Sequence, residues 1–310
     1  MFDDLDEELV ARAGSADAGV RRVAMMDLAE EIEPAATTLL IAGLRDSDDA
    51  VREAAAKGLD EHEGIEAARA LADALDDPSS CVRAAVAEAL ADRKEPAIGS
   101  ALIERCAHHD PFVRAAALRA LRDLALPAAG APARAALGDV SDDVRLQAVG
   151  VLGYLKDPEH LTVLASLAGD PSAAVRRAVM AALVRSGEAV ATLSAGLDDA
   201  DWQVREEAAA SLGKSGAVEA SGQLTDALRD PAWQVRIKAA GALGKLGIVA
   251  AVPALGATLG SEISNLRKEV ASALGEIGSA AALPYLEGAA ADPDPDVRKI
   301  VRWAIGKCAA

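Results

Sequence analysis

The sequence predicts an all-α protein, a right-handed α-solenoid of about ten stacked antiparallel helix pairs that forms one continuous array over residues 1–310. A Val-Arg dipeptide, once replaced by Leu-Arg, occurs ten times at spacings of 31 residues, with one spacing of 29. Apolar residues follow each dipeptide at helical spacing. Hydrophobic residues make up 51% of the chain and aromatic residues only 2%, so the predicted core consists of Ala, Leu and Val.

The second helix of each predicted pair contains the dipeptide, whose Val we number position 0. Position +4 is Ala or Val, and position +8 is Leu in nine repeats and Ile305 in the last. Positions 0, +4 and +8 share one helix face, and a small residue at +4 lets neighbouring helices approach closely. Upstream, apolar residues at −11 and −7, such as Leu224 and Leu228, predict the first helix of the pair.

Turn-forming residues flank the second helix. Position −5 is Asp in seven repeats and Ser in two, and Pro often follows, as in Asp230-Pro231. Asp or Ser at the N-cap, with Pro next, is typical of a helix start. Gly at +9, as in Gly213 and Gly244, is typical of a C-terminal cap. We therefore expect each second helix to be capped at these two positions.

A single helix pair cannot fold alone. Its few buried aliphatic side chains contribute ~1.5–3 kcal/mol each, whereas ordering ~30 residues costs at least ~1 kcal/mol per residue. Stability must therefore be shared along the array. We expect an acidic capping helix over residues 1–14 and a bend or short helix over 126–133, where Pro127 and Pro132 interrupt the pattern without changing the register.

The repeat resembles a known family. The clearest copy combines Asp230-Pro231, Val235-Arg236, Ala239 and Ala242-Leu243-Gly244. This pattern resembles the short HEAT-like repeats, ~31 residues long, that are named after phycobilisome lyases, and the resemblance extends over the whole chain. It implies the fold. Similar repeats occur in bilin lyase subunits, phycobilisome-degradation factors, deoxyhypusine hydroxylase and many scaffolds, so it does not imply one activity.

An arginine follows position 0 in every repeat. It lies near the start of the second helix, where the helix dipole disfavours a cation, so we expect the turn acids at −5 and −3 of the same or the next repeat to pair with it. The alternative is a row of anion-binding sites. The ten residues of this predicted ladder are Arg21, Arg52, Arg83, Arg114, Arg145, Arg176, Arg205, Arg236, Arg267 and Arg298.

Aromatic residues fall at positions outside the predicted core. Trp202 and Trp233 both occupy position −2, in the near-identical segments Asp-Trp-Gln-Val-Arg and Ala-Trp-Gln-Val-Arg. Phe112 occupies −1 and Trp303 occupies +6. In such a solenoid these positions face the concave side, so the rings are candidate partner-binding anchors. The alternative is that each ring packs over a neighbouring turn, or that Trp303 covers the C-terminal end.

Cations share this predicted surface. They are Arg177, Lys268 and Lys299 at +2 and Lys238 at +3. A basic, aromatic stripe would bind an acidic partner segment, a carboxylated ligand or a phosphate. The alternative is an ordinary solvated helix face, because Glu206, Glu207 and Glu269 lie between these cations.

Several classes of function are disfavoured. The net charge of −17 argues against nucleic acid, and no apolar run reaches the ~18 residues of a membrane span. His62-Glu63 is the only His-Glu pair, so the di-iron chemistry of deoxyhypusine hydroxylase is not expected. Cys106, His108, His109 and Asp110 form the one ligand-like cluster, but there is no second group of ligands elsewhere, so we expect no metal site. Nothing in the sequence calls for a cofactor.

The sequence thus predicts a cytoplasmic, non-catalytic scaffold. It would bind a protein or peptide with acidic groups through the concave face of the second helices, using the rings and cations named above. The alternative is a tetrapyrrole-handling accessory protein that resembles bilin lyase subunits. A helical-repeat base-excision enzyme is a third hypothesis, which would require DNA binding.

Overall fold

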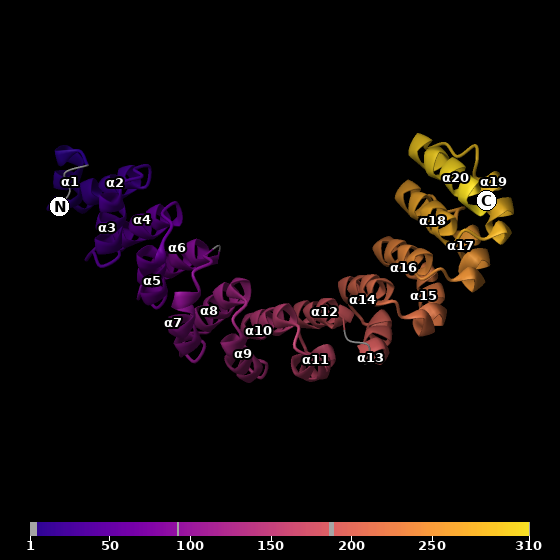
Figure 1. The fold of residues 1–310 in the computed structure, drawn as a ribbon, viewed down its shortest axis with the longest axis horizontal. Coiled ribbons are helices and arrows are strands. Elements are labelled where there is room, and N and C mark those ends of the chain that lie inside the picture. The colour runs from indigo at the N-terminus through magenta and orange to yellow at the C-terminus, as the bar shows by residue number, and fades with distance from the viewer. Residues whose placement is uncertain (1–4, 92, 186–188, 310) are drawn as a thin grey trace. The chain divides into compact units, whose positions relative to one another are not determined.

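The computed structural model describes residues 5–91, 93–185 and 189–309. These residues form helices and no strands, which confirms the predicted all-α solenoid of helix pairs. The chain contacts divide it into two compact units, residues 1–155 and 156–310. Figure 1 shows two layers of helices within each unit, one formed by the first helices of the pairs and one by the second helices. The prediction of one continuous array over 1–310 stays a prediction.

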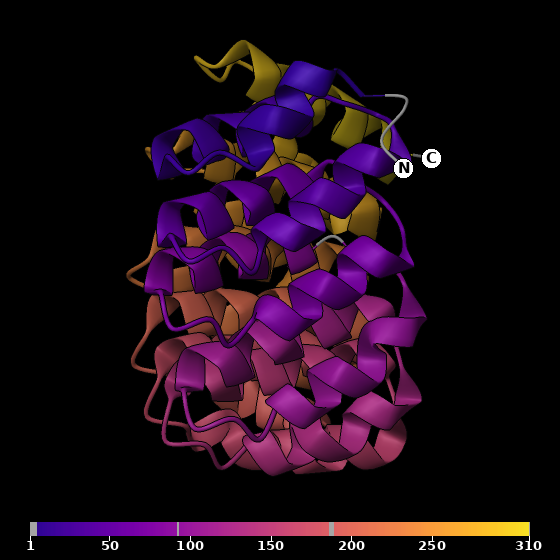
Figure 2. The ribbon, with the colours of Figure 1, turned by 90° about the vertical axis from the view of Figure 1, so that its left-hand side faces the viewer.

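Unit 1 contains five helix pairs, whose helices are stacked in two columns (Figure 2). Its first helices are α1 (Glu7–Ala13), α3 (Pro34–Gly43), α5 (Ile65–Ala74), α7 (Gly99–Arg105) and α9 (Gly130–Ala136). Its second helices are α2 (Ala18–Leu28), α4 (Asp49–Asp60), α6 (Ser80–Ala91), α8 (Pro111–Leu124) and α10 (Asp142–Leu155).

Unit 2 contains five further pairs. Its first helices are α11 (Pro158–Ala165), α13 (Val190–Ala195), α15 (Ser221–Asp226), α17 (Val252–Thr258) and α19 (Leu283–Gly288). Its second helices are α12 (Ala173–Ala182), α14 (Trp202–Ser215), α16 (Trp233–Lys245), α18 (Ser264–Ile277) and α20 (Pro295–Cys308). Each second helix packs against the next one, α14 on α16, α16 on α18 and α18 on α20.

The core follows the repeat pattern. Val235, Ala239 and Leu243, at positions 0, +4 and +8 of α16, are fully buried, and so are their counterparts Val204, Ala208 and Leu212 of α14. Fully burying such an aliphatic side chain contributes ~1.5–3 kcal/mol. Stacking of the pairs therefore supplies the stability that a single pair lacks.

The predicted N-cap at −5 is wrong. In α14 the N-cap is Asp201, at position −3, whose carboxylate accepts from the amide of Gln203 at 2.8 Å. Asp199, at −5, instead accepts from the amide of Asp201 at 2.8 Å and binds an arginine of the preceding repeat. In α14 both positions carry Asp, but the preceding repeat's Arg176 binds the one at −5, and the one at −3 caps the helix.

The predicted C-cap at +9 is also wrong. Gly213 and Gly244 lie inside α14 and α16, and the C-cap of α14 is Gly216, which has a left-handed φ of 77°. A Cβ added to Gly213 would lie 2.8 Å from the Cα of Ala242 on α16. Glycine is therefore needed at +9 because the backbones of neighbouring second helices approach closely.

Two local expectations fall in unit 1. Over 126–133 the chain forms a 3₁₀ turn, Pro127–Ala129, and the start of the short helix α9. Pro132 lies in the first turn of α9, where its missing N–H removes no helical hydrogen bond. The acidic helix expected over 1–14 corresponds to α1, which is capped by Asp6, while residues 1–4 lie outside the described residues.

Candidate functional site

The arginine at +1 joins consecutive repeats. Arg52 donates from Nε and Nη2 to the carboxylate of Asp77, at 2.8 and 3.0 Å, and Asp77 is position −5 of the next repeat. Its Nη1 donates to the carbonyl oxygens of Asp46 and Ser47, at 2.9 and 3.3 Å, in its own repeat. Each guanidinium thus ties two turns together. We call this contact, in which Nε and Nη2 of one arginine both donate to one carboxylate, the arginine fork. The same fork joins Arg21 to Asp46, Arg114 to Asp139, Arg176 to Asp199, Arg205 to Asp230 and Arg267 to Asp292.

These ion pairs affect protonation. The hydrogen bond from Arg114 is the main cause that holds the pKa of Asp139 below its usual value, against the opposing effect of burial. The carboxyls of Asp46, Asp199 and Asp292 have lowered pKa values for the same reason. The ladder carboxylates are therefore ionised and stabilising at neutral pH.

Among the residues that the structure describes, Arg83, Arg236 and Arg298 do not form this fork. Arg83 faces a repeat with His108 at −5, and its Nη2 lies 3.4 Å from the carboxylate of Asp110 instead. Arg145 and Arg298 donate Nη1 to backbone carbonyls of their own turns, like the others. Arg236 faces Ser261, 25 residues further along the chain.

Trp202 and Trp233 lie at equivalent places in unit 2. They are the first residues of α14 and α16, which are adjacent second helices (Figure 1), and their exposed fractions are 37% and 40%. Trp303 is 42% exposed but lies further along its helix, and its ring edge packs against α18: a Cβ on Gly275 would be 2.5 Å from its Cζ3. The first two rings therefore occupy equivalent positions on adjacent helices, and Trp303 packs over the neighbouring helix.

Phe112 belongs to a separate place in unit 1. Its ring, 40% exposed, lies at the start of α8 with the Arg83 guanidinium 6.0 Å from its centroid. It lines a cavity of about 350 Å³ on the second-helix layer, together with the alanines of α6 and α8 and the Arg119 side chain. Glu88, Asp143 and Gln147 also line this cavity, so its wall combines one aromatic ring and small apolar side chains with polar and charged groups.

The predicted cationic stripe is partly neutralised. The Nε of Arg177 lies 3.9 Å from a carboxylate oxygen of Glu207, and the Nζ of Lys238 lies 4.0 Å from one of Glu206. Lys268 and Lys299 form no ion pair with any described residue, and Lys299 is exposed. The surface therefore carries both signs of charge, with two uncommitted cations.

Glu269 of α18 is the unusual acid of this surface. Its carboxylate packs against Gly241 of α16. Burial, and then the charge of Glu276, raises its pKa above the usual value, although Lys245 and Lys238 oppose this shift. A carboxylate at this place is thus destabilised when it is ionised.

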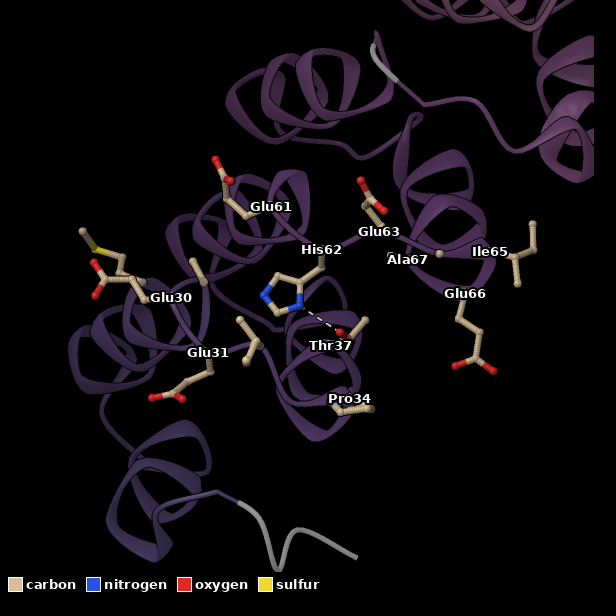
Figure 3. A pocket seen from close by; sticks show the side chains of 14 residues that line it. Glu30, Glu31, Pro34, Thr37, Glu61, His62, Glu63, Ile65, Glu66 and Ala67 are labelled. Carbon is tan, nitrogen blue, oxygen red and sulfur yellow. Dashed lines mark hydrogen bonds between the residues drawn. The ribbon is translucent and has the colours of Figure 1, made fainter.

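A larger cavity in unit 1 was not predicted. It measures about 990 Å³ and is lined at the turns of the first repeats by apolar residues that include Met26 and Ile32, the latter 93% exposed. His62 points toward it, but its Nδ1 accepts from Thr37 at 2.8 Å and its Nε2 donates to the Leu28 carbonyl at 3.2 Å (Figure 3). The acids that line it are Glu30, Glu31, Glu61, Glu63 and Glu66.

This cavity offers carboxylates to a cationic group beside apolar contacts. The sequence carries a signal for it, since residues 1–155 have 30 acidic and 16 basic residues, a net charge of −14, against −3 for residues 156–310. The glutamates come from two turns one repeat apart, and only the stacking of the repeats brings them together.

The Cys-His cluster has structural roles. Cys106 is buried and its thiol donates to the carbonyl of Leu102, and burial raises its pKa to about 12. The Nδ1 of His108 accepts from the amide of Asp110 at 3.1 Å. Within the described parts of the chain, no three or more His, Cys, Asp or Glu side chains are grouped to hold a metal ion, and no helix is long and apolar enough to span a membrane.

The comparisons agree with this architecture. A family profile for HEAT repeats matches residues 7–91, 68–139, 130–213 and 221–306. No curated protein sequence matches the chain. Among solved structures, an engineered protein is 21% identical with a TM-score of 0.53, and the match covers 98% of both chains. The Escherichia coli protein YibA is 22% identical with a TM-score of 0.65, over 82% of this chain and 95% of its own.

Human deoxyhypusine hydroxylase, in complex with glycerol, is 25% identical with a TM-score of 0.37, over 88% of this chain and 96% of its own. The likeness to the engineered protein and to YibA extends to the fold alone. The family match, in contrast, covers nearly the whole length and rests on the repeat itself. The chain therefore belongs to the HEAT-repeat family.

Proposed function

We propose that this chain is a non-catalytic scaffold that binds a protein or peptide segment on the second-helix layer of unit 2, with Trp202 and Trp233 as its anchors. The observation that carries the proposal is the exposure of two equivalent indoles, 37% and 40%, at the starts of adjacent helices in a chain with only three Trp. Large aromatic side chains dominate the binding energy of protein interfaces.

The surrounding charges define the kind of partner. Lys268 and Lys299 are available to acidic groups, whereas Arg177 and Lys238 already have glutamates nearby. An acidic segment with apolar residues would match the rings and the two available cations. The three free cysteines are consistent with a reducing compartment such as the cytoplasm.

The test is selection of binding peptides from a random phage library on the wild-type protein. We expect the selected peptides to lose at least ~10-fold in affinity for a Trp202→Ala/Trp233→Ala variant, about the loss of one interface hot spot. The matched control is Tyr285→Ala on α19, a ring with the same 37% exposure in the first-helix layer. Equal affinity for all three proteins, with unchanged melting temperatures, would contradict the proposal.

The resemblance of the repeat sequence to the phycobilisome-lyase type makes tetrapyrrole handling the rival function. Incubation of the purified protein with a bilin or haem distinguishes the two. The scaffold proposal predicts an unchanged visible spectrum of the added pigment. A saturable spectral shift that is lost in the double Trp variant would assign the same surface to a tetrapyrrole instead.

A further inference from the structure

Two ladder guanidiniums, those of Arg83 and Arg236, have a buried Nε without a hydrogen-bond partner, but Arg83 lies 3.4 Å from the carboxylate of Asp110. Arg236 of α16 donates from Nη1 to the carbonyl of Asp230 at 2.9 Å, as its counterparts do in their own turns. Its Nε is buried from solvent and has no hydrogen-bond partner. Arg236 also forms no ion pair with any residue that the structure describes.

The cause is one substitution in the next repeat. At the usual distance of 25 residues the chain has Ser261 in place of the ladder aspartate. The Oγ of Ser261 accepts from the amide of Ile263 at 3.3 Å, so it keeps the turn contact that the aspartates make. A serine is shorter than an aspartate and carries no charge, so it does not replace the carboxylate that the arginine fork binds elsewhere.

The preceding repeat is an internal control. Arg205 lies in the same Trp-Gln-Val-Arg sequence, and its Nε and Nη2 donate to Asp230 at 2.7 and 2.9 Å. The two repeats thus share the Trp-Gln-Val-Arg segment, although only α14 has a side-chain N-cap, and one has an occupied fork and the other an unoccupied fork.

The chemistry of an unoccupied guanidinium fork is specific. A buried donor that lacks a partner costs free energy, and a guanidinium is best satisfied by a planar anion that accepts two parallel hydrogen bonds. Trp233 lies three residues before Arg236 on α16, which places both side chains on neighbouring parts of the same helix surface. Trp233 and Arg236 are thus one helical turn apart on α16.

We propose that Arg236 is a carboxylate-binding site, and that it receives an acidic side chain of the segment that docks on Trp233. The second part rests on the proposed function. The first part does not, because any small carboxylate would occupy the same fork. The ligand would occupy the position that the aspartate carboxylate occupies in the other arginine–aspartate pairs.

The first experiment uses acetate as the probe, with chloride at equal ionic strength as the reference. The Arg236 Nε–H signal in an NMR spectrum, assigned with Arg236→Lys, should shift saturably with acetate in the wild-type protein. Ser261→Asp should abolish this response and raise the melting temperature by about 2–4 °C, because it supplies the missing rung. Asp230→Ser should create a second acetate-responsive signal, from Arg205.

Two results would overturn the site. An absent acetate response in the wild-type protein would mean that the fork holds only water, and an equal response in Ser261→Asp would mean that acetate acts elsewhere. Trp233→Ala should keep the acetate response, so this arm is independent of peptide docking.

The second experiment uses the peptides selected on the wild-type protein. Ser261→Asp should weaken their binding about 10-fold. Replacing the acidic residues of the peptide with amides should cause the same loss with the wild-type protein. The amide peptides should bind Ser261→Asp no more weakly than the acidic peptides do. Unchanged peptide affinity in Ser261→Asp, with the acetate response intact in the wild-type protein, would contradict the link to the partner but not the site.

Discussion

Removing one ladder carboxylate should destabilise the junction between two repeats. Asp230 accepts three hydrogen bonds, from Arg205 Nε at 2.7 Å, from Arg205 Nη2 at 2.9 Å and from the Ala232 amide at 2.8 Å. The two side chains are only 8% and 13% exposed, so water replaces these bonds poorly. Asp230→Ala would leave both guanidinium donors without an acceptor.

The expected cost is about 3 kcal/mol. A hydrogen bond to a charged group contributes ~1.5–3 kcal/mol when it is buried, and solvent near the turn reduces the sum for the three bonds. Urea unfolding followed by circular dichroism measures this loss as a lower midpoint. Since repeat arrays share stability between neighbours, hydrogen exchange of α14 and α16 amides should report the largest local loss.

The matched control is Asp226→Ala in the same repeat. Asp226 pairs with Arg229 at 3.9 Å, but the two side chains are 83% and 79% exposed, so its removal should cost less than ~0.5 kcal/mol. If Asp230→Ala cost no more than Asp226→Ala, the ladder would not hold the repeats together and the reasoning would be refuted.

Four further predictions concern protonation, thiols and packing. Because folding lowers the pKa of the ladder carboxyls below 3.8, their stabilisation is complete above that pH, and the urea midpoint should fall steadily as the pH falls below it. Glu269→Gln should be more stable than the wild-type protein at neutral pH, since burial raises the pKa of Glu269, and the gain should shrink as the pH falls below that pKa and vanish below 4.5. Ellman's reagent should label Cys81, which is exposed, much faster than the buried Cys106, whose pKa is about 12, and denaturant should remove the difference. Gly213→Ala should cost about 1–3 kcal/mol in a thermal melt because its Cβ would meet α16, whereas Gly222→Ala, with open space around it, should gain about 0.5–1 kcal/mol.

Much of the fold could be predicted from the sequence because the repeat supplies many copies of one pattern. The period placed position 0 correctly in the core in nine repeats, as Val204 and Val235 show, whereas Val20 of the first repeat is 38% exposed. The caps were misplaced because Asp occurs at both −5 and −3, and a single repeat does not reveal that Asp199 binds Arg176 of its neighbour. The glycines at +9 were misassigned for a similar reason, since a close approach between helices leaves no trace within one helix.

The candidate site was predictable only in part. The position of Trp202 and Trp233 within the repeat correctly predicted that they lie outside the core. The contact between Trp303 and Gly275, in contrast, depends on how α18 and α20 pack. The pairing of Lys238 with Glu206 likewise joins residues one repeat apart. The acidic cavity of unit 1 is formed by turns of successive repeats, so its volume exists only in the folded stack.

The indole N–H signals of the protein test the central claim most directly. The chain has three tryptophans, so single Phe variants assign all three signals in a ¹H–¹⁵N spectrum. On addition of a selected peptide, the signals of Trp202 and Trp233 should shift together and saturate at the measured affinity, while that of Trp303, packed on Gly275, should shift less. Saturated binding that leaves the first two signals unmoved would show that the partner docks on another face.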